Sequence, residues 1–387
     1  MSKVRLGVVG YGNMGATHCR SIMREGKVPN MEVTAICDID PDRLALAEER
    51  FPEVARFDNA TDLFKSGLCD AVIIAVPHYD HPKLVIEAFE NDLNVITEKP
   101  AGVYTKQVQE MNEAAAKSDK LFGIMYNQRT NPMYQKIREM VQSGELGHIK
   151  RISWIITTWY RPQAYHDSGS WRSTWKTEGG GALINQNPHQ LDLWQWMFGM
   201  PDKITSFVSF GKYYDIEVED DVTAYFEYEN GTTGTYITST GEVPGTNRLE
   251  IACDMGKIVV ENDQMIFHRN VVSEREHNKT NTLPFGRPEC WKCEIPVQGQ
   301  GEQHPGIFKN FADAVLSGKK LLAPGEEGIN GLTISNSIHY SAWTGKTVDT
   351  KNFPHDEFYE LLQEKIRNSK VDKSNVKRND ADTDGTY

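Results

Sequence analysis

The run Gly7-Val8-Val9-Gly10-Tyr11-Gly12-Asn13-Met14-Gly15 lies near the amino terminus and decides our interpretation of the fold. It contains the spacing G-x-G-x-x-G at Gly10, Gly12 and Gly15. The apolar residues before it are typical of a buried strand, and residues 14–24 after it have the spacing of a helix. A strand, a glycine turn and a helix in this order predict the first unit of a parallel α/β sheet.

The same alternation continues for about 125 residues. Apolar runs predict strands at 4–9, 32–37, 71–76, 94–97 and 121–126. Helical spacing predicts helices at 14–24, 41–50, 83–91 and 106–118. We therefore expect residues 1–125 to form a doubly wound Rossmann domain, whose parallel sheet is buried on both faces.

The pattern changes after residue 126, where longer strands are joined by short turns such as Glu229-Asn230-Gly231. We expect strands at 149–158, 203–209, 221–228, 232–239, 247–253 and 256–261, and helices at 132–143, 179–197, 305–317 and 328–344. Residues 126–368 should form an α/β domain for substrate binding and oligomerisation, built on a large, mostly antiparallel open sheet. The polar residues 369–387 are predicted to be a disordered tail.

Composition excludes several classes of protein. The chain has 387 residues and a formal net charge of -12, which disfavours a nucleic-acid partner. We find no apolar run long enough for a membrane helix and no signal peptide, so we expect a cytoplasmic protein without a membrane partner. Cys290 and Cys293 form a C-x-x-C without a second pair of ligands nearby, so we expect no metal.

The glycine turn predicts a dinucleotide site. Its glycines allow a tight turn, a close approach of the backbone to a pyrophosphate and close packing of helix on strand. Asp38 follows the second predicted strand, where an acid would accept hydrogen bonds from the adenosine ribose and repel a 2′-phosphate. Ile39 follows it instead of a basic residue, so we expect NAD and not NADP. The alternative is a glycine turn with a helix-capping Asp and no ligand, which the strand–turn–helix context disfavours.

Two further segments carry a family resemblance. Val76-Pro77-His78-Tyr79-Asp80-His81 and Glu98-Lys99-Pro100 each follow a predicted strand, and Gly179-Gly180-Gly181-Ala182-Leu183-Ile184-Asn185-Gln186-Asn187-Pro188-His189-Gln190-Leu191-Asp192 comes later. Over roughly residues 3–365, the chain resembles the Gfo/Idh/MocA oxidoreductases, named for glucose-fructose oxidoreductase and inositol dehydrogenase. The resemblance implies that Lys99 stands at the active site and that the later glycine motif completes it.

One position departs from the family pattern. Many members carry Asp where this chain has Asn185. An amide cannot take a proton at working pH, but it can orient a substrate hydroxyl. His189 lies four residues further on, and so on the same face of the predicted helix, and it becomes the second acid–base candidate beside Lys99.

Oxidation of a secondary alcohol by NAD requires the protein to handle the hydroxyl proton and the developing alkoxide. Lys99 could supply a positive charge or, with a lowered pKa, a base, and His189 could share or relay the proton. The alternatives are a surface lysine after a strand and a hydrogen-bonded helix histidine. Lys99 follows the carboxyl end of a parallel strand, where α/β sheets bind ligands, and this favours a functional role.

We expect further residues around the two ligands. The predicted cofactor residues are Gly10, Gly12, Asn13, Met14, Gly15, Asp38, Pro77, His78, His81, Glu98, Lys99 and Asn127. For Glu98 a capping or salt-bridge role is the alternative, and for His81 a helix start. The predicted substrate residues are Lys99, Tyr126, Tyr160, Arg161, His166, Trp171, Arg172, Asn185 and His189.

Several of these come from residues 158–172, which mix aromatic and polar side chains as carbohydrate sites do. A packed lid or a subunit contact would give the same composition. The family pattern also places Arg129 at the junction of the domains. Further along the later helix, Asp192 is a weaker site candidate, while Trp194 and Trp196 are expected in the core.

Three functions remain open from the sequence. The first is a dehydrogenase acting on a sugar, a glycoside at ring C3, or a cyclic polyol such as inositol. The second is an NAD-dependent glycosidase or lyase that oxidises its substrate transiently, and the third is a non-catalytic NAD sensor. Because an open sheet with an apolar face needs cover, we also expect a homo-oligomer, a dimer or a tetramer, formed through the second sheet.

Overall fold

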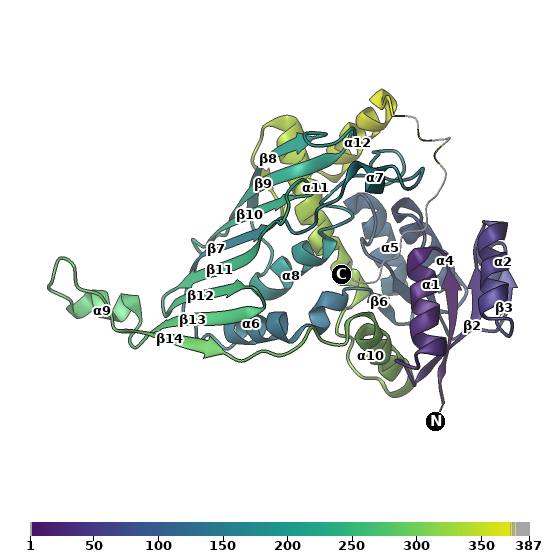
Figure 1. Cartoon of the computed structure of the whole chain (residues 1–387), viewed down its shortest axis with the longest axis horizontal. Coiled ribbons are helices and arrows are strands. Elements are labelled where there is room, and N and C mark those ends of the chain that lie inside the picture. Colours follow the sequence, from purple (N-terminus) through teal and green to yellow (C-terminus); the bar gives the residue numbers. More distant parts are fainter. Residues whose placement is uncertain (1, 372, 374–375, 377–387) are drawn as a thin grey trace.

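The computed structural model describes residues 2–371, 373 and 376, and these form two sheets with helices around and between them (Figure 1). The first sheet is parallel, six-stranded and ordered β3-β2-β1-β4-β5-β6. The second has nine strands, ordered β14-β13-β12-β11-β7-β10-β9-β8-β15. The predicted fold class, a Rossmann sheet followed by a large, mostly antiparallel sheet, is confirmed.

The elements of the first half agree closely with the predicted ones. The strands are β1 (Val4–Val9), β2 (Met31–Cys37), β3 (Ala55–Phe57), β4 (Ala71–Ile74), β5 (Asn94–Thr97) and β6 (Phe122–Ile124). The helices are α1 (Asn13–Cys19), continued by a π-helical turn over Arg20–Arg24, α2 (Pro41–Arg50), α3 (Ala60–Lys65), α4 (His81–Glu90) and α5 (Thr105–Lys117). The sequence missed β3 and α3, which are too short to show a clear periodicity.

The second half contains the longer strands. They are β7 (Ile149–Ile156), β8 (Lys203–Phe210), β9 (Glu219–Glu227), β10 (Thr233–Ser239), β11 (Asn247–Cys253), β12 (Gly256–Glu261), β13 (Gln264–Asn270), β14 (Cys290–Ile295) and β15 (Val348–Asp349). The helices are α6 (Pro132–Gln142), α7 (Gln163–His166), α8 (Pro188–Phe198), α9 (Glu274–Thr280), α10 (Gln303–Ser317), α11 (Gly328–Thr344) and α12 (His355–Asn368). In the described part of the chain, β7 and β10 pair in parallel and the other neighbours in this sheet are antiparallel.

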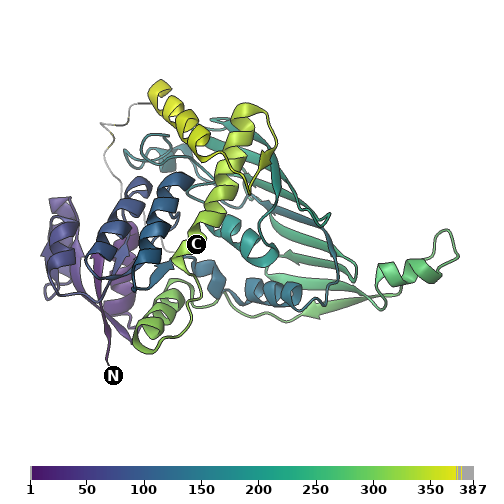
Figure 2. The same cartoon turned by 180° about the vertical axis from the view of Figure 1, so that it is seen from behind.

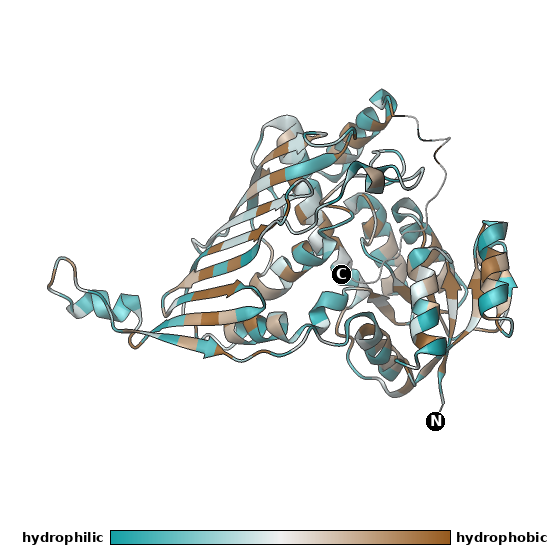
Figure 3. Cartoon of the chain, in the orientation of Figure 1, coloured by the Kyte–Doolittle hydropathy of each residue, from teal (hydrophilic) through white to brown (hydrophobic). Residues whose placement is uncertain are grey.

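Helices α6, α8 and α11 lie between the nine-stranded sheet and the Rossmann sheet in both views (Figure 1, Figure 2). They cover the inner face of the nine-stranded sheet, where Val222, Ala224 and Phe226 of β9 are buried. The residues that alternate with them, such as Thr223 and Tyr225, lie on the open face. This alternation shows as brown and teal bands along the strands (Figure 3). The apolar face is therefore covered by helices of the same chain.

The predicted helix at 179–197 is wrong in its first half. Helix α8 begins only at Pro188, and residues 179–187 form turns instead. Gly179 and Gly180 have φ angles of 87° and 158°, which a right-handed helix does not allow. Asn185 therefore does not share a helical face with His189, and the two side chains reach the site from different elements.

Two other expectations concern the carboxyl-terminal tail and membrane-spanning helices. The tail predicted from residue 369 falls largely on residues outside the described set. Among the described residues, no helix combines the length and the apolar character that crossing a bilayer requires.

Candidate active site

The glycine turn between β1 and α1 is packed too closely for side chains. A Cβ atom at Gly10 would lie 2.4 Å from the carbonyl oxygen of Ala75, and Gly10 also has a φ of +96°. A Cβ atom at Gly15 would lie 1.9 Å from the carbonyl oxygen of Gly10. The turn thus brings the start of α1, with Gly12 as its N-cap and the half-buried Asn13 and Met14, against the ends of the central strands. This is the geometry that a pyrophosphate at a helix N-terminus requires.

Asp38 is fixed beside this turn. Its Oδ2 atom accepts a hydrogen bond of 2.7 Å from the Tyr11 amide, and its Oδ1 atom accepts one of 2.9 Å from the Asp40 amide. The carboxylate is partly exposed, and the Ile39 side chain that follows is 88% exposed. The residues present therefore fit a bound NAD, with a carboxylate held where the adenosine ribose would lie and no basic side chain next to it for a 2′-phosphate.

Lys99 joins the first sheet to the later glycine motif. It follows β5, and its Nζ atom donates a hydrogen bond of 3.0 Å to the Asn185 carbonyl oxygen. Burial lowers the pKa of the Lys99 ammonium, although the charge of Glu98 opposes this effect. A lysine whose pKa is lowered in this way can exchange a proton with a substrate nearer to neutral pH than an exposed lysine can.

Glu98 is held on the other side by a histidine that the sequence did not single out. Its Oε1 atom lies 2.7 Å from Nε2 of His18, and both side chains are buried. Burial raises the pKa of Glu98, but the hydrogen bond and charge of His18 outweigh it and lower the pKa to about 2. His304 of α10 packs against His18 with 5.5 Å between ring centroids. The one feature of the sequence that could have pointed to His18 is its position, one helical turn after Gly15 of the glycine motif.

His189 stands in the first turn of α8 and is 3% exposed. Within the described part of the chain, neither of its ring nitrogens has a hydrogen-bond partner. Burial, followed by the charge of Lys99, lowers its pKa well below the ordinary value. The imidazole is therefore neutral near pH 7, and both nitrogens remain for a ligand. The buried Tyr126 packs edge-on to it, with 6.3 Å between ring centroids.

Glu178, which sequence reasoning also missed, lies beside Asn185. The Asn185 side-chain amide donates a hydrogen bond to Oε1 of Glu178, and the Ser173 amide donates one of 2.5 Å to Oε2. Glu178 is 2% exposed. Burial raises its pKa above the ordinary value, against the opposing charge of Arg172. Its position directly before the glycine motif was the only hint in the sequence.

The aromatic segment contributes a wall next to these groups. Arg172 donates a hydrogen bond of 2.6 Å to the Tyr165 hydroxyl and lies over the rings of Tyr165 and Trp171, at 4.4 and 4.6 Å from their centroids. Trp171 meets His78 edge-on at 5.4 Å, and Nδ1 of His78 lies 3.0 Å from the Glu178 carbonyl oxygen. The structure thus brings Trp171, Arg172 and His78 together with Glu178.

The other predicted residues of this segment stay predicted substrate contacts. His166 is buried, and its Nδ1 atom lies 2.7 Å from the Ser173 hydroxyl, while its Nε2 atom has no partner among the described residues. The Arg161 guanidinium lies over Trp159, 5.6 Å from its ring centroid. Tyr160 is 43% exposed.

Some residues at the junction have roles that differ from the predicted ones. Both nitrogens of His81 lie within 2.8 Å of carbonyl oxygens, those of Pro100 and Val76, so neither nitrogen is left for a ligand. Arg129 binds both carboxylate oxygens of Asp192, at 2.9 and 2.6 Å, and both side chains are buried. Asp192 therefore balances the charge of Arg129, and its role in the site stays a prediction.

One polar side-chain atom of Asn127 lacks a hydrogen-bond partner among the described residues. Its side-chain amide donates a hydrogen bond of 2.7 Å to Gln303, whereas its Oδ1 atom is buried and has no partner among the described residues. Pro77 is exposed just after β4. Both stay predicted cofactor contacts.

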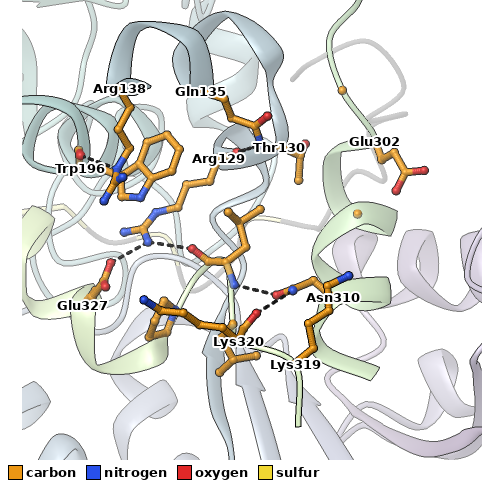
Figure 4. Close-up of a pocket in the computed structure, with 15 residues that line it drawn as sticks. Arg129, Thr130, Gln135, Arg138, Trp196, Glu302, Asn310, Lys319, Lys320 and Glu327 are labelled. Carbon is orange, nitrogen blue, oxygen red and sulfur yellow. Dashed lines mark hydrogen bonds and ion pairs between the residues drawn. The ribbon is translucent and has the colours of Figure 1, made fainter. Parts of the chain in front are cut away.

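A separate cavity of about 620 Å³ lies on the far side of Arg129. Arg129, Arg138, Trp196, Lys320 and Glu327 are among its lining residues (Figure 4). Arg129 is neutralised there by Glu327, at 2.6 Å, as well as by Asp192. None of the residues predicted for catalysis, cofactor or substrate lines this cavity, so it is distinct from the Lys99 site.

Comparisons with known proteins agree with this geometry. Residues 4–126 match the family model described as "Oxidoreductase family, NAD-binding Rossmann fold", and residues 134–259 match the Gfo/Idh/MocA C-terminal domain. The inositol 2-dehydrogenase of Corynebacterium glutamicum is 34% identical over 151 residues, which are 38% of this chain and 44% of that protein. The chain spans about half the length of the curated relatives it matches.

Solved structures share the whole fold. The WlbA dehydrogenase of Chromobacterium violaceum, solved with NADH and UDP-GlcNAcA, has a TM-score of 0.77 and 25% identity, covering 90% of this chain and 96% of its own. Levoglucosan dehydrogenase, solved with NADH and levoglucosan, has a TM-score of 0.74 and 20% identity, covering 90% of this chain and 100% of its own. With its NAD-binding Rossmann domain and the matching second domain, this chain belongs to the Gfo/Idh/MocA family of oxidoreductases.

Proposed function

We propose that the protein is an NAD-dependent dehydrogenase that oxidises a secondary hydroxyl on a sugar, a glycoside or a cyclic polyol. One observation carries the proposal. Lys99, whose pKa is lowered by burial, interacts with His189, whose buried ring nitrogens have no partner in the described chain, and Lys99 follows β5 of the sheet that carries the glycine turn that fits NAD. Two proton-handling groups next to a hydride acceptor are what alcohol oxidation requires.

The division of labour follows from these environments. NAD supplies the hydride acceptor when it is bound. The neutral form of Lys99 takes the hydroxyl proton, since burial lowers its pKa and so makes that form easier to reach than in an exposed lysine. The neutral imidazole of His189 hydrogen-bonds to the same hydroxyl and fixes its direction. Asn185 holds Lys99 in place through its backbone carbonyl.

The aromatic wall supports a ring-shaped polyhydroxylated substrate. Trp171 and Tyr165 offer faces for a sugar ring, and Arg172 between them offers donors for hydroxyls. The names of the relatives, inositol 2-dehydrogenase and levoglucosan dehydrogenase, belong to the same class of substrate. Within this class we favour a glycoside oxidised at ring C3, because residues 158–172 carry more aromatic surface than one ring needs.

The test is the NADH absorbance of purified protein with NAD and a panel of inositols, free sugars and glucosides. A rise with a subset of ring polyols supports the proposal, and the rise must vanish when Lys99 is replaced. Hydrolysis of a glucoside without net NADH would contradict it and favour the glycosidase or lyase reaction. Binding of NAD with no reaction on any member of the panel would contradict the substrate class.

Homo-oligomer formation stays a prediction, but its physical reason changes. The apolar face of the second sheet is already covered by helices, so the open face is the candidate interface. Phe207 is 77% exposed there and Tyr225 is 43% exposed. Light scattering on the wild type and on a Phe207→Glu variant tests it: loss of an oligomer in the variant supports this face, and a monomeric wild type contradicts it.

A further inference from the structure

Asn185 leaves the catalytic segment of the glycine motif without an ionisable carboxylate. Many family members have Asp at this position, and an amide neither carries charge nor titrates. Nevertheless, a carboxylate does contact this position in the folded chain, and it comes from seven residues earlier in the sequence. It belongs to Glu178, the residue immediately before the first glycine of the motif.

The contacts form a continuous path from this carboxylate to the lysine. Oε1 of Glu178 accepts a hydrogen bond from the Asn185 side-chain amide. The Asn185 carbonyl oxygen accepts one of 3.0 Å from Nζ of Lys99. One residue therefore bonds to both groups, the side chain to the carboxylate and the backbone to the ammonium. Glu178 is 2% exposed, so its charge is screened little by solvent.

Glu178 differs from the structural carboxylate of the same region. Glu219 uses both oxygens to accept backbone hydrogen bonds of 2.9 Å, from Gly181 and Leu183, and its Oε2 atom also lies 2.9 Å from Nε2 of His339. One oxygen of Glu178 accepts a hydrogen bond from the Ser173 backbone amide, and the other accepts one from the side-chain amide of Asn185.

Several charged or titratable groups surround Glu178, and they come from different segments of the chain. Arg172, Lys99 and Lys373 face it with positive charge, Glu219 faces it with negative charge, and Nδ1 of His78 lies 3.0 Å from its carbonyl oxygen. Burial raises the pKa of Glu178, while its negative charge raises the pKa of Lys99. The proton affinities of the two groups are therefore coupled.

We propose that Glu178 is a positioning residue that supplies, through Asn185, the carboxylate that the glycine motif itself lacks. This rests on the proposed function. The Glu178 carboxylate fixes the Asn185 side chain towards the substrate, and its negative charge stabilises the Lys99 ammonium that forms when Lys99 takes the hydroxyl proton. No covalent bond to Glu178 forms or breaks.

The first test is the pH profile of kcat/KM for alcohol oxidation in Glu178→Gln. The amide keeps the size and shape of the side chain but has no charge, and its single oxygen can accept only one of the two hydrogen bonds that Glu178 accepts. Loss of the charge lowers the pKa of Lys99, so the acid limb of the profile should move to lower pH by about one unit. The weaker base should also reduce the plateau rate by about tenfold. An acid limb at the wild-type position would overturn the proposal, because a merely structural role lowers the rate without moving a pKa.

The control and the rescue use the same chain. Glu217→Gln removes a carboxylate that binds the Trp175 amide of the same segment without touching Asn185, and it should leave the acid limb in place. Asn185→Asp in the Glu178→Gln background returns a carboxylate to the motif and should restore the wild-type profile. A double variant that keeps the shifted profile of Glu178→Gln would overturn the proposal.

A second readout separates this inference from the proposed function. Infrared difference titration of the NAD-bound protein detects the C=O stretch of a protonated carboxyl group without any turnover. A band that Glu178→Gln removes, and whose titration moves to higher pH in Lys99→Met because the neighbouring positive charge is gone, supports the proposal even if no tested polyol is oxidised. A titration of that band that Lys99→Met leaves unchanged overturns it, even if the protein proves to be a dehydrogenase.

Discussion

The molecule contains two glycine-rich loops that precede a helix, and they are built in different ways. The loop at Gly10–Gly15 packs partly on itself, because the Cβ atom that Gly15 lacks would collide with the carbonyl oxygen of Gly10 in the same turn, and partly on the end of β4, where a Cβ atom at Gly10 would meet the carbonyl oxygen of Ala75. The loop at Gly179–Gly181 depends on distant chain, since a Cβ atom at Gly181 would lie 2.2 Å from the carbonyl oxygen of Glu219. The Glu219 carboxylate also accepts hydrogen bonds from the backbone amides of Gly181 and Leu183.

Because the two loops are built differently, we expect them to have different functions. A local turn that opens a helix presents backbone amides, which suits a phosphate that every dinucleotide carries. A loop anchored on a distant strand can instead place the Asn185 carbonyl oxygen, and then His189 in the following helix, next to Lys99, which follows a strand of the other sheet. The first loop should therefore control NAD affinity and the second should control turnover.

The largest expected effect is at Lys99, where the second loop meets the first sheet. Lys99→Met keeps the aliphatic stem and removes the proton-accepting nitrogen, so turnover should fall by about 10³-fold. NAD affinity should change little, because the glycine turn and Asp38 are untouched. Steady-state kinetics and calorimetric NAD titration measure both quantities. Turnover that survives nearly intact would show that the loops do not meet at a catalytic lysine.

Glu98 tests the link between Lys99 and α1 of the first loop. Its pKa in the folded chain is lowered to about 2, so Glu98 stabilises the fold above the pKa of an ordinary glutamate. That contribution is lost as the pH falls from about 4.5 towards about 2. At pH 7, Glu98→Gln should lower the free energy of unfolding by about 3 kcal/mol, and the difference from wild type should shrink in acid. Urea unfolding at several pH values measures it, and a difference that is independent of pH would contradict the account.

Two matched glycine-to-alanine substitutions disturb the conformation of one loop at a time. Gly15→Ala should weaken NAD binding by about 100-fold, since the new methyl group would displace the turn from Gly10. Gly181→Ala should leave NAD affinity within about threefold and reduce turnover by about 100-fold, because it moves the loop that carries Asn185. Fluorescence titration of NAD and initial rates decide between these outcomes. Equal effects of both substitutions on NAD affinity would remove the distinction between the loops.

The smallest effect sharpens the assignment of the first loop. Asp38→Ala removes the carboxylate that the Tyr11 and Asp40 amides hold in place. NAD affinity should fall by about tenfold, and the preference for NAD over NADP should decrease because the charge repulsion is gone. Binding constants for both cofactors provide the check. An unchanged preference would exclude Asp38 from cofactor selection.

The two loops also show why sequence reasoning succeeded in one place and failed in another. Strands such as Asn94–Thr97 and helices such as Pro41–Arg50 follow from local periodicity, and the first glycine turn follows from its neighbours. The second loop was predicted as helix because the glycines stand before an apolar run. Its turn conformation depends on Glu219, about forty residues later, which no local pattern contains.

The site residues divide in the same way. Lys99 and His189 could be named because their motifs are contiguous, and the structure brings them together with His78, Trp171 and Arg172. His18 was missed because its partner Glu98 lies 80 residues away, and Glu178 was missed because its role arises from burial and from the turns that bring Asn185 back to it. The ion pair of Asp192 with Arg129, 63 residues away, could not be read from the sequence either.

The central claim is that the two loops bring NAD and a ring hydroxyl together for hydride transfer, and a deuterium transfer experiment tests it most directly. Wild-type protein is incubated with NAD and a ring polyol that carries deuterium on the carbinol carbons, and the reduced cofactor is examined by mass spectrometry. The account predicts one deuterium in the cofactor and none when Lys99→Met replaces the wild type. Reduced cofactor without deuterium, or equal transfer by Lys99→Met, would contradict it.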